Sequence, residues 1–238
     1  MKTRYGLWSA AWVEFQETLE ARARDPNVRR IGDIGAGANP RLSPDFVAQH
    51  DVDYVLLDIS ESELAKAPAE HTKIVADMEA PSVDAGEPYD FVFTRSTLEH
   101  IRSPEAFHRN VLSMLKPGGE AAHSFPTLYA LPLTLNRILP ERLVHAALMR
   151  IQPWRAHEGE FSKFPAFYRW CRGPSKRQRR RFEGIGFEVI EYAGFFGHDY
   201  YDRIPPLKSA EHRLAAALVR HPVPLLTSYA YVVLRRPA

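Results

Sequence analysis

The sequence contains very little cysteine: Cys171 is the only one among 238 residues. A single cysteine excludes an internal disulfide framework and a cysteine-rich zinc site. Neither sign of charge predominates, because the chain has 31 basic and 29 acidic residues and a formal net charge of +2. So small an excess gives no indication of a nucleic-acid partner.

Long hydrophobic runs are missing as well. No stretch approaches the ~18 consecutive apolar residues that a helix needs to cross a bilayer. Residues 1–6 lead into a charged pattern without the apolar core of a signal peptide. The apolar share of 45% is that of a globular protein, not of a disordered one. We therefore expect a soluble, cytoplasmic protein whose residues 1–238 form a single domain.

Helix and strand signals alternate through the first half of the chain. Trp8, Trp12, Phe15 and Leu19 recur at helical spacing, which predicts one apolar stripe on a helix. Ser-Pro pairs at residues 43–44 and 103–104 are typical of helix starts. Between these helices, apolar runs predict strands at residues 28–34, 54–57, 73–76, 91–93 and 120–125. This alternation favours a parallel sheet with helices on both faces.

The pattern is interrupted at residues 126–174, which are rich in proline and aromatic residues. We interpret this segment as a helical and aromatic insertion that forms a lid. A helix over 176–184 and a strand over 187–192 follow. A final helix places Leu207, Ala210, Leu214 and Leu218 on one face, and the last strand covers 228–234.

The residues with the clearest chemical meaning lie where the first predicted strand ends. Gly35 and Gly37 permit a tight turn and a close approach of the backbone to a ligand. Asp58 ends the next strand, at the spacing where such a unit presents a carboxylate to a ribose. A nucleoside-containing ligand and simple turn chemistry both explain the pattern. Pro40 stands where a dinucleotide-binding motif would have its third glycine.

At this point the sequence resembles the class I S-adenosylmethionine-dependent methyltransferases, and the resemblance covers most of the chain. Its landmarks are Asp33-Ile34-Gly35-Ala36-Gly37, Asp58, Ala76-Asp77-Met78, Tyr89-Asp90-Phe91-Val92, Leu98-Glu99-His100-Ile101 and Leu115-Lys116-Pro117-Gly118-Gly119. The resemblance implies an α/β, Rossmann-like, mostly parallel sheet of seven strands in the order 3-2-1-4-5-7-6, with the last strand antiparallel. It also implies S-adenosyl-L-methionine as the cofactor.

The resemblance assigns a cofactor contact to each motif residue. Asp33 would face the methionine ammonium, directly or through water. The backbone of Gly35, Ala36 and Gly37 would lie along the methionine and ribose. Asp58 would accept hydrogen bonds from the ribose hydroxyls.

Four further residues follow from the same resemblance. Ile59 would pack on the adenine, and Asp77 would accept a hydrogen bond from its amino group. Met78 would offer a backbone amide and an apolar flank to the ring. Arg95 would line the cofactor pocket, although a surface salt bridge explains this arginine equally well.

Glu99 and His100 are the candidate catalytic residues, because they follow the fourth strand where a side chain could reach a methyl acceptor. Methyl transfer from a sulfonium needs mainly orientation and a dry pocket. A base is needed only if the acceptor must lose a proton, and histidine suits that role near neutral pH. His100 could instead hydrogen-bond the cofactor carboxylate or cap a helix.

The insertion is expected to select the substrate. Residues 128–155 alternate leucines with arginines, which is typical either of helices packed over a sheet edge or of a peripheral membrane contact. The aromatic residues 164–170 suit either a stacked ring substrate or the core. His157, Glu158 and Glu160 have no spacing that would bring them together, so we expect no metal site. The basic run 176–181 is a solvated helix face or an anion-binding surface.

We therefore expect a methyltransferase for a small-molecule, glycan or lipid-linked acceptor, most simply by O-methylation at the inner face of a membrane or in the cytoplasm. Two alternatives stay open: an NAD(P)-dependent reductase or epimerase, and a non-catalytic protein that binds S-adenosylmethionine. Pro40 and the lack of a Tyr-x-x-x-Lys pair argue against the reductase. The oligomeric state is left open.

Overall fold

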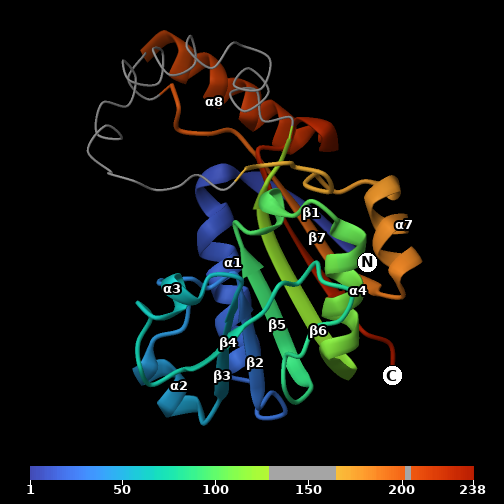
Figure 1. Cartoon of the computed structure of the whole chain (residues 1–238). Coiled ribbons are helices and arrows are strands. Elements are labelled where there is room, and N and C mark those ends of the chain that lie inside the picture. The colour runs from blue at the N-terminus through green and yellow to red at the C-terminus, as the bar shows by residue number, and fades with distance from the viewer. Residues whose placement is uncertain (129–164, 202–204) are drawn as a thin grey trace.

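A computed structural model gives the structure of the protein, and it describes residues 1–128, 165–201 and 205–238. Within these ranges eight strands form one sheet with helices on both faces (Figure 1). The strands are β1 (Lys2–Leu7), β2 (Arg30–Ile34), β3 (Asp53–Asp58), β4 (Thr72–Val75), β5 (Tyr89–Arg95), β6 (Leu115–Pro126), β7 (Glu188–Phe196) and β8 (Tyr229–Arg235). The helices are α1 (Trp8–Ala23), α2 (Pro44–His50), α3 (Glu61–Leu64), α4 (Pro104–Met114), α7 (Lys176–Ile185) and α8 (Pro205–Arg220), with single 3-10 turns at η1 (Leu98–His100) and η3 (Pro224–Leu226).

The order of strands across the sheet is β1-β7-β8-β6-β5-β2-β3-β4. The seven strands predicted from the sequence are β2 to β8, and they lie in the predicted order. β8 runs antiparallel to β6 and β7, while the other pairs are parallel. The Rossmann-like fold class is thereby confirmed.

The strand that the sequence analysis did not predict is β1, which pairs in parallel with the edge of β7. Long-range contacts stabilise this strand: Arg4 Nε donates to Glu191 Oε1 at 2.6 Å, and Arg4 also pairs with Glu14 and Tyr231. The Tyr5 ring stacks on Phe196 at 5.7 Å. Such partners are distant in sequence, so a local hydrophobic pattern does not indicate them.

Hydrogen bonds from backbone amides to side-chain oxygens explain where two helices begin. At α2 the Ser43 hydroxyl accepts a hydrogen bond from the Phe46 amide at 3.2 Å, as expected of an N-cap. At α4 the cap comes from a distant residue instead. The Glu79 carboxylate accepts from the amides of Arg102 (3.1 Å) and Ser103 (2.5 Å), which places a negative charge at the positive end of the helix.

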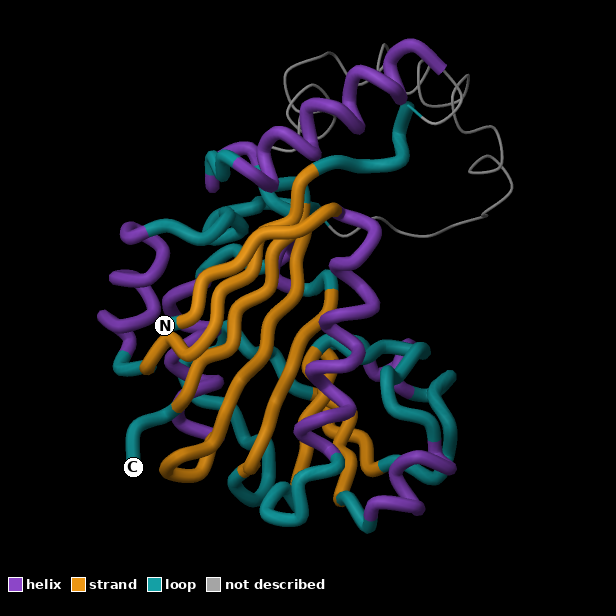
Figure 2. The backbone as a smooth tube through the Cα atoms, turned by 180° about the vertical axis from the view of Figure 1, so that it is seen from behind, coloured by secondary structure: helices purple, strands orange, loops and turns teal. Residues whose placement is uncertain are grey.

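Helices lie on both sides of the sheet (Figure 2), and each face carries one hydrophobic cluster. On one face Phe15 and Leu19 of α1 pack with Leu64 of α3. On the other face Phe107 of α4 packs with Phe182 of α7. Because both faces are covered, the central strands are apolar on both sides, as their sequences predict.

The strand order places a switch point between β2 and β5. From β2 the chain proceeds to β3 and β4 on one side, and β5 then returns to the other side of β2. Ligands of such sheets bind outside the carboxyl ends of the strands at this point. α8 crosses the same edge of the molecule in both views (Figures 1 and 2).

The predicted lid, residues 126–174, is described only at its two ends. Residues 129–164 lie outside the described residues, and with them most of the segment 128–155. After residue 165 the chain is irregular up to α7, and Cys171 is buried against the core. Within the described residues, no helix is long and apolar enough to cross a membrane.

Candidate active site

The turn after β2 depends on glycine at residue 35. Gly35 has φ +77° and Gly37 has φ +49°, both in the left-handed region. A Cβ on Gly35 would collide with the side chain of Thr97, which follows β5. The Gly35 amide donates to the carbonyl of Leu57 at 2.7 Å. The turn therefore lies tightly against the ends of β3 and β5.

Asp58 holds this turn from the neighbouring strand. Its Oδ2 accepts a hydrogen bond from the Gly37 amide and its Oδ1 accepts one from the Ser60 amide, both at 2.9 Å. The carboxylate is half-buried and lines a cleft. Each carboxylate oxygen has further lone pairs, so Asp58 can also accept hydrogen bonds from a ligand.

The cleft has a volume of about 670 Å³ and lies at the carboxyl ends of β2, β3 and β5. It brings together six of the residues predicted from the sequence: Gly35, Asp58, Ile59, Asp77, Met78 and His100. Ser96, Thr97, Glu79 and Phe167 also line it, and the sequence analysis did not predict them. Ser96 and Thr97 could have been found from their position, because they directly follow a strand that ends at the switch point.

The walls of the cleft suit an adenine ring. Ile59 is 59% exposed, an unusual state for an isoleucine beside a cleft. Met78 is buried, and its carbonyl accepts a hydrogen bond from Asn110 Nδ2 at 3.0 Å. The exposed Asp77 accepts at Oδ1 from the Glu79 amide at 2.8 Å. Apolar side chains and a carboxylate thus occur together, the combination of apolar walls and a few placed polar groups that small-molecule sites use.

Four of the predicted cofactor residues do not line this cleft: Asp33, Ala36, Gly37 and Arg95. Asp33 is buried, and its Oδ2 accepts from the Tyr54 hydroxyl at 2.6 Å and the Arg41 amide at 3.2 Å. Burial raises the pKa of Asp33 to about 6. The Arg95 guanidinium lies over the ring of Trp12, 4.6 Å from its centroid. Their contacts with the cofactor stay predictions.

The two candidate catalytic residues, Glu99 and His100, lie in one 3-10 turn but have different surroundings. His100 lines the cleft, with Nδ1 3.2 Å from the carbonyl oxygen of Pro165. Glu99 is 6% exposed, and its Oε2 has no hydrogen-bond partner among the described residues. Burial raises the pKa of Glu99 to about 8. Glu99 is therefore a buried carboxyl group that titrates near neutral pH.

Tyrosines surround Glu99. The backbone oxygen of Glu99 accepts from the amides of Phe167 (2.6 Å) and Tyr168 (3.1 Å). Burial raises the pKa values of Tyr168 and Tyr229, and the charge of Glu99 raises them further. Tyr229 begins β8 and packs edge-on against Trp12 at 5.3 Å. We call this group, Glu99, Tyr168, Tyr229 and Trp12, the Glu99 cluster.

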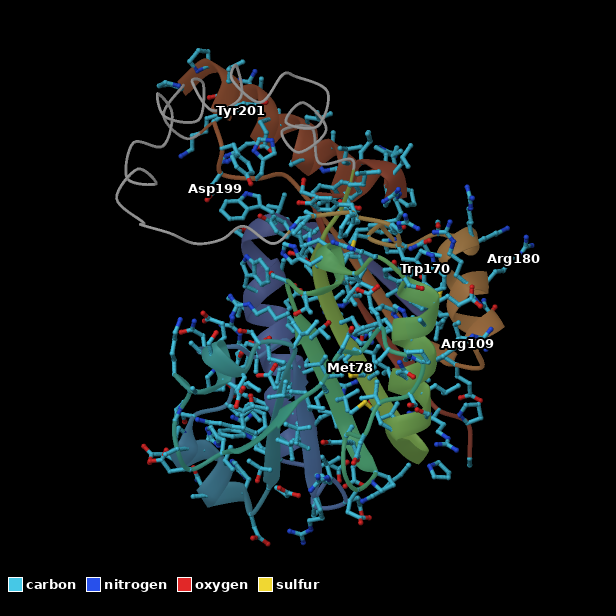
Figure 3. The ribbon with its side chains drawn as sticks, viewed as in Figure 1. Met78, Arg109, Trp170, Arg180, Asp199 and Tyr201 are labelled. Carbon is cyan, nitrogen blue, oxygen red and sulfur yellow. The ribbon has the colours of Figure 1, made fainter. Side chains whose placement is uncertain are left out.

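The Glu99 cluster draws on segments far apart in the sequence. Tyr229 and Trp12 were not predicted as site residues, because their positions indicate only a strand start and a helix stripe. Tyr200, in the loop after β7, also interacts electrostatically with Tyr168 and Tyr229. Its neighbour Asp199 lies below α8 (Figure 3). His157, Glu158 and Glu160 lie outside the described residues.

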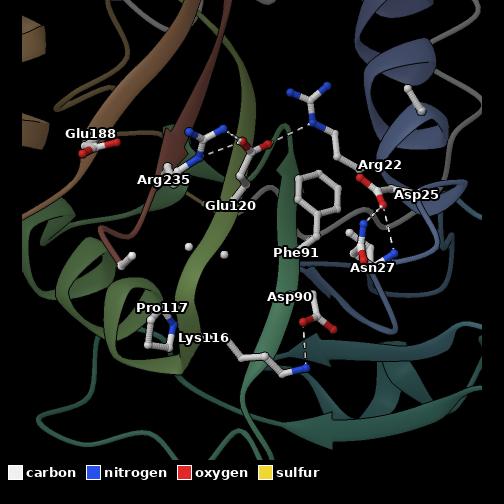
Figure 4. A pocket seen from close by; sticks show the side chains of 15 residues that line it. Arg22, Asp25, Asn27, Asp90, Phe91, Lys116, Pro117, Glu120, Glu188 and Arg235 are labelled. Atoms are coloured by element: carbon white, nitrogen blue, oxygen red, sulfur yellow. Dashed lines mark hydrogen bonds and ion pairs between the residues drawn. The ribbon is translucent and has the colours of Figure 1, made fainter.

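A second pocket, of about 810 Å³, lies at the opposite, amino-terminal edge of the strands (Figure 4). Its charged side chains pair with one another. Glu120 bonds Arg22 at 3.2 Å and Arg235 at 2.8 Å, and Lys116 bonds Asp90 at 2.7 Å. Although this pocket is larger than the cleft, its paired charges have less to offer a ligand.

Solved structures with the same fold include several proteins that share little sequence with this chain. The [4+2]-cyclase SpnF is 14% identical with a TM-score of 0.57, over 98% of this chain and 83% of that one. Phosphoethanolamine N-methyltransferase 2 of Haemonchus contortus, in complex with S-adenosyl-L-methionine, is 16% identical with a TM-score of 0.57, over 95% of this chain and 53% of that one. An S-adenosylmethionine-dependent methyltransferase of Mesorhizobium loti is 20% identical with a TM-score of 0.53, over 92% and 96% of the two chains. At these identities the likeness concerns the fold.

The sheet order, the glycine turn and the carboxylate that ends β3 define a class I S-adenosylmethionine-dependent methyltransferase. A family model described as a methyltransferase domain matches residues 9–192, and the chain belongs to this family. No curated protein sequence matches the chain. The enzyme class and the cofactor expected from the sequence are thereby confirmed, and the reductase alternative is not supported.

Proposed function

We propose that this enzyme methylates a hydroxyl oxygen of a small-molecule, glycan or lipid-linked acceptor, with Glu99 as the base that removes the hydroxyl proton. The observation that carries the proposal is the buried Glu99 carboxyl group, whose Oε2 has no hydrogen-bond partner among the described residues. A buried polar atom without a partner is costly, so its persistence suggests that a ligand completes it.

The residues at the cleft fit S-adenosylmethionine. Asp58 would hold the ribose hydroxyls, since its oxygens face the cleft and retain lone pairs. The exposed Ile59 and the buried Met78 would flank the adenine, and Asp77 would accept from its amino group. The glycine at residue 35 supports the same fit, because a side chain there would displace Thr97 from the cleft wall.

S-adenosylmethionine held by Asp58, Asp77 and Met78 would supply an electrophilic methyl group to the acceptor oxygen, with the sulfonium sulfur as the leaving group. The acceptor hydroxyl must then lose one proton. Glu99 in its ionised form takes that proton and becomes a neutral carboxylic acid. A pKa near 8 suits this role, because a base performs best when its pKa lies close to the working pH.

His100 has a different proposed role. It lines the cleft itself, and its Nδ1 lies 3.2 Å from the Pro165 carbonyl oxygen. This contact orients the ring, so His100 is proposed to position the cofactor while Glu99 serves the acceptor. The aromatic rings of Tyr168 and Tyr229 would pack against the acceptor and exclude water.

The acceptor is proposed to come from a membrane. We propose a cytoplasmic enzyme that meets a membrane-borne acceptor at the inner membrane face, with residues 128–155 as one contact. The leucines and arginines of that segment support this by composition. Residues 126–174 would then form the lid that selects the acceptor.

Transfer of a tritiated methyl group from S-adenosylmethionine to cell extract tests the proposal, with lipid and aqueous phases counted separately. Mass spectrometry of the labelled product should place the methyl group on oxygen. With that acceptor, kcat should rise with pH and level off above about 8, because only ionised Glu99 can accept a proton.

Two results would contradict the proposal. Methylation of nitrogen or carbon in the isolated product would refute the O-methyltransferase assignment. Tight cofactor binding without methyl transfer to any fraction would favour the non-catalytic alternative. A thermal shift of the folded protein reports binding independently, since a ligand at 100 times its Kd adds about 2.7 kcal/mol of apparent stability.

A further inference from the structure

Arg95, the last residue of β5, has a fixed guanidinium group whose hydrogen-bond donors are not used within the described structure. The group lies over the ring of Trp12, 4.6 Å from the ring centroid. Such stacking occupies the face of a guanidinium and leaves its five in-plane N–H donors able to bind oxygens. Arg95 is half-buried, and its side chain has no hydrogen bond or ion pair with the described residues. A desolvated cation is therefore held in place with its donors available to a ligand.

Other arginines that lie over aromatic rings in the described ranges differ from Arg95 in this respect. Four of them also donate a hydrogen bond to a side-chain or backbone oxygen: Arg4, Arg24, Arg30 and Arg181. Arg102, which lies over the ring of Phe167, is exposed to solvent, where water can bind its donors. Within these ranges, Arg95 alone combines stacking, partial burial and a lack of protein acceptors, which is the state expected of a guanidinium that binds a ligand.

A second arginine, Arg41, lies along the same side of α1. Its carbonyl oxygen accepts a hydrogen bond from Gln16 Nε2 at 3.5 Å. Gln16 follows Trp12 by four residues on α1, so the two side chains lie on one face of the helix. Burial lowers the pKa of Arg95, and the positive charge of Arg41 lowers it further. The two cations therefore repel each other, and an anion bound beside both would relieve this repulsion.

Asp33 compensates the two cations only in part. Its charge acts on Arg95, but its Oδ2 already accepts hydrogen bonds from the Tyr54 hydroxyl and the Arg41 backbone amide. It forms no ion pair with the guanidinium group of Arg95 or of Arg41. One carboxylate thus stands against two positive charges, so the surroundings of Arg95 and Arg41 keep a positive excess that suits an anionic ligand.

The position of Arg95 relates it to the acceptor more closely than to the cofactor. Neither Arg95 nor Arg41 lines the cleft that is proposed to hold S-adenosylmethionine. Trp12, which lies under the Arg95 guanidinium, packs edge-on against Tyr229 at 5.3 Å. Trp12 and Tyr229 both belong to the Glu99 cluster, where the acceptor hydroxyl is proposed to react. A ligand group bound by Arg95 would therefore lie next to that cluster.

We propose that Arg95, with Arg41 beside it, binds an oxyanion, a carboxylate or a phosphate, that the methyl acceptor carries in addition to its reacting hydroxyl. A guanidinium group binds both anions through paired N–H···O hydrogen bonds, and charge-assisted bonds of this kind are strong. The carboxylate of the cofactor fits less well, because neither arginine lines the cleft. The inference rests on the proposed function for the place of the reacting hydroxyl, whereas the binding of an anion is measurable without methyl transfer.

Binding of inorganic phosphate and of acetate to the full chain, saturated with S-adenosylhomocysteine, tests this inference. Thermal-shift titrations at constant ionic strength separate binding from general screening. Arg95→Gln and Arg41→Gln each remove one guanidinium group. Arg181→Gln is the matched control, because Arg181 is also half-buried and also lies over a tryptophan ring, that of Trp170 at 5.5 Å.

The wild type should bind one of the two anions saturably, and the anion with the lower Kd shows whether the acceptor group is a phosphate or a carboxylate. Arg95→Gln and Arg41→Gln should each raise that Kd by on the order of tenfold, because each removes charge-assisted hydrogen bonds. Arg181→Gln should bind like the wild type, and all three variants should keep the wild-type affinity for S-adenosylhomocysteine in calorimetry. With the identified acceptor, Arg95→Gln should raise KM and leave kcat nearly unchanged, because it binds a group other than the reacting one.

Three outcomes would overturn the inference. One is a wild type that binds neither anion saturably. Another is a Kd that is unchanged in Arg95→Gln or in Arg41→Gln, or that rises equally in Arg181→Gln. The third is an Arg95→Gln variant that binds S-adenosylhomocysteine more weakly but keeps its affinity for methylthioadenosine, which lacks the carboxylate, because this would assign the arginine to the cofactor. Failure of anion binding leaves the O-methyltransferase proposal standing, whereas methylation of nitrogen or carbon contradicts only that proposal.

Discussion

The two edges of the sheet carry pockets of similar size but of different chemistry. At the amino-terminal edge, in the larger pocket, Glu120 is paired with Arg22 and Arg235, and Lys116 is paired with Asp90. At the carboxyl edge, Asp58 faces a cleft and the nearby Glu99 has an oxygen without a partner among the described residues. Size therefore does not distinguish the two edges, whereas the pairing of their charged groups does.

This comparison indicates that polar groups without hydrogen-bond partners identify a binding site better than pocket volume does. Paired charges already stabilise each other, and a ligand would have to break these pairs before it could bind. At the carboxyl edge the strand ends, the glycine turn and the buried carboxyl group are arranged so that a ligand adds interactions and breaks none. Each of the following predictions tests this contrast.

The largest effect is expected from Glu99→Gln. The amide keeps the shape of the side chain but cannot accept a proton, so kcat should fall by about 10²- to 10⁴-fold. Affinity for S-adenosylmethionine should stay unchanged in calorimetry, because Glu99 does not line the cofactor cleft. Steady-state kinetics with the identified acceptor measures the fall in kcat.

A stability measurement on the same variant provides an independent check. The pKa of Glu99 is raised by burial from an ordinary 4.5 to about 8, so the folded state holds this proton more tightly than the unfolded state. The stabilisation relative to Glu99→Gln is complete below the ordinary pKa and is lost as the pH rises toward 8. A difference in the free energy of unfolding that does not depend on pH would contradict the buried, protonated carboxyl group.

A smaller effect is expected from Asp58→Ala at the carboxyl edge. Loss of hydrogen bonds to a charged group should weaken cofactor binding by about 1.5–3 kcal/mol, as measured by calorimetry. Glu120→Gln is the matched control at the other edge, because it removes a carboxylate that bonds only other protein side chains in the described structure. If both substitutions weakened cofactor binding equally, the inference that the cofactor binds at the carboxyl edge would be wrong.

The smallest effect concerns two glycines with the same backbone conformation, Gly35 (φ +77°) and Gly118 (φ +78°). Alanine at either position is strained by on the order of 1 kcal/mol. At Gly118 a Cβ meets nothing within 4 Å, whereas at Gly35 it collides with Thr97. Thermal unfolding should therefore show a greater loss of stability for Gly35→Ala than for Gly118→Ala, and equal losses would argue against the tight turn.

Much of the fold follows from local sequence patterns. The alternation of apolar runs with capped helices predicted seven strands, because each βαβ unit is encoded by neighbouring residues. Their order was implied by the resemblance to the class I methyltransferases. β1 was not predicted, since Arg4 finds its partners Glu191 and Tyr231 far along the chain.

Part of the site could be predicted because local sequence patterns show where the strands end. Asp58, Ile59 and Met78 occupy strand ends, and strand ends of a parallel sheet converge at one edge. The sequence could not separate Glu99 from His100, which are adjacent in the chain and differ only in the direction that the 3-10 turn gives them. It also could not reveal that Asp33 bonds Tyr54, since this contact depends on the packing of β3 against the turn.

Glu79 lines the cleft, and its carboxylate also accepts hydrogen bonds from the amides of Arg102 and Ser103, directly before α4. Displacement of this carboxylate would expose those two amides to solvent. Their protection from hydrogen exchange therefore reports whether Glu79 stays in place when a ligand occupies the cleft, and magnetic resonance can measure it before any acceptor is identified.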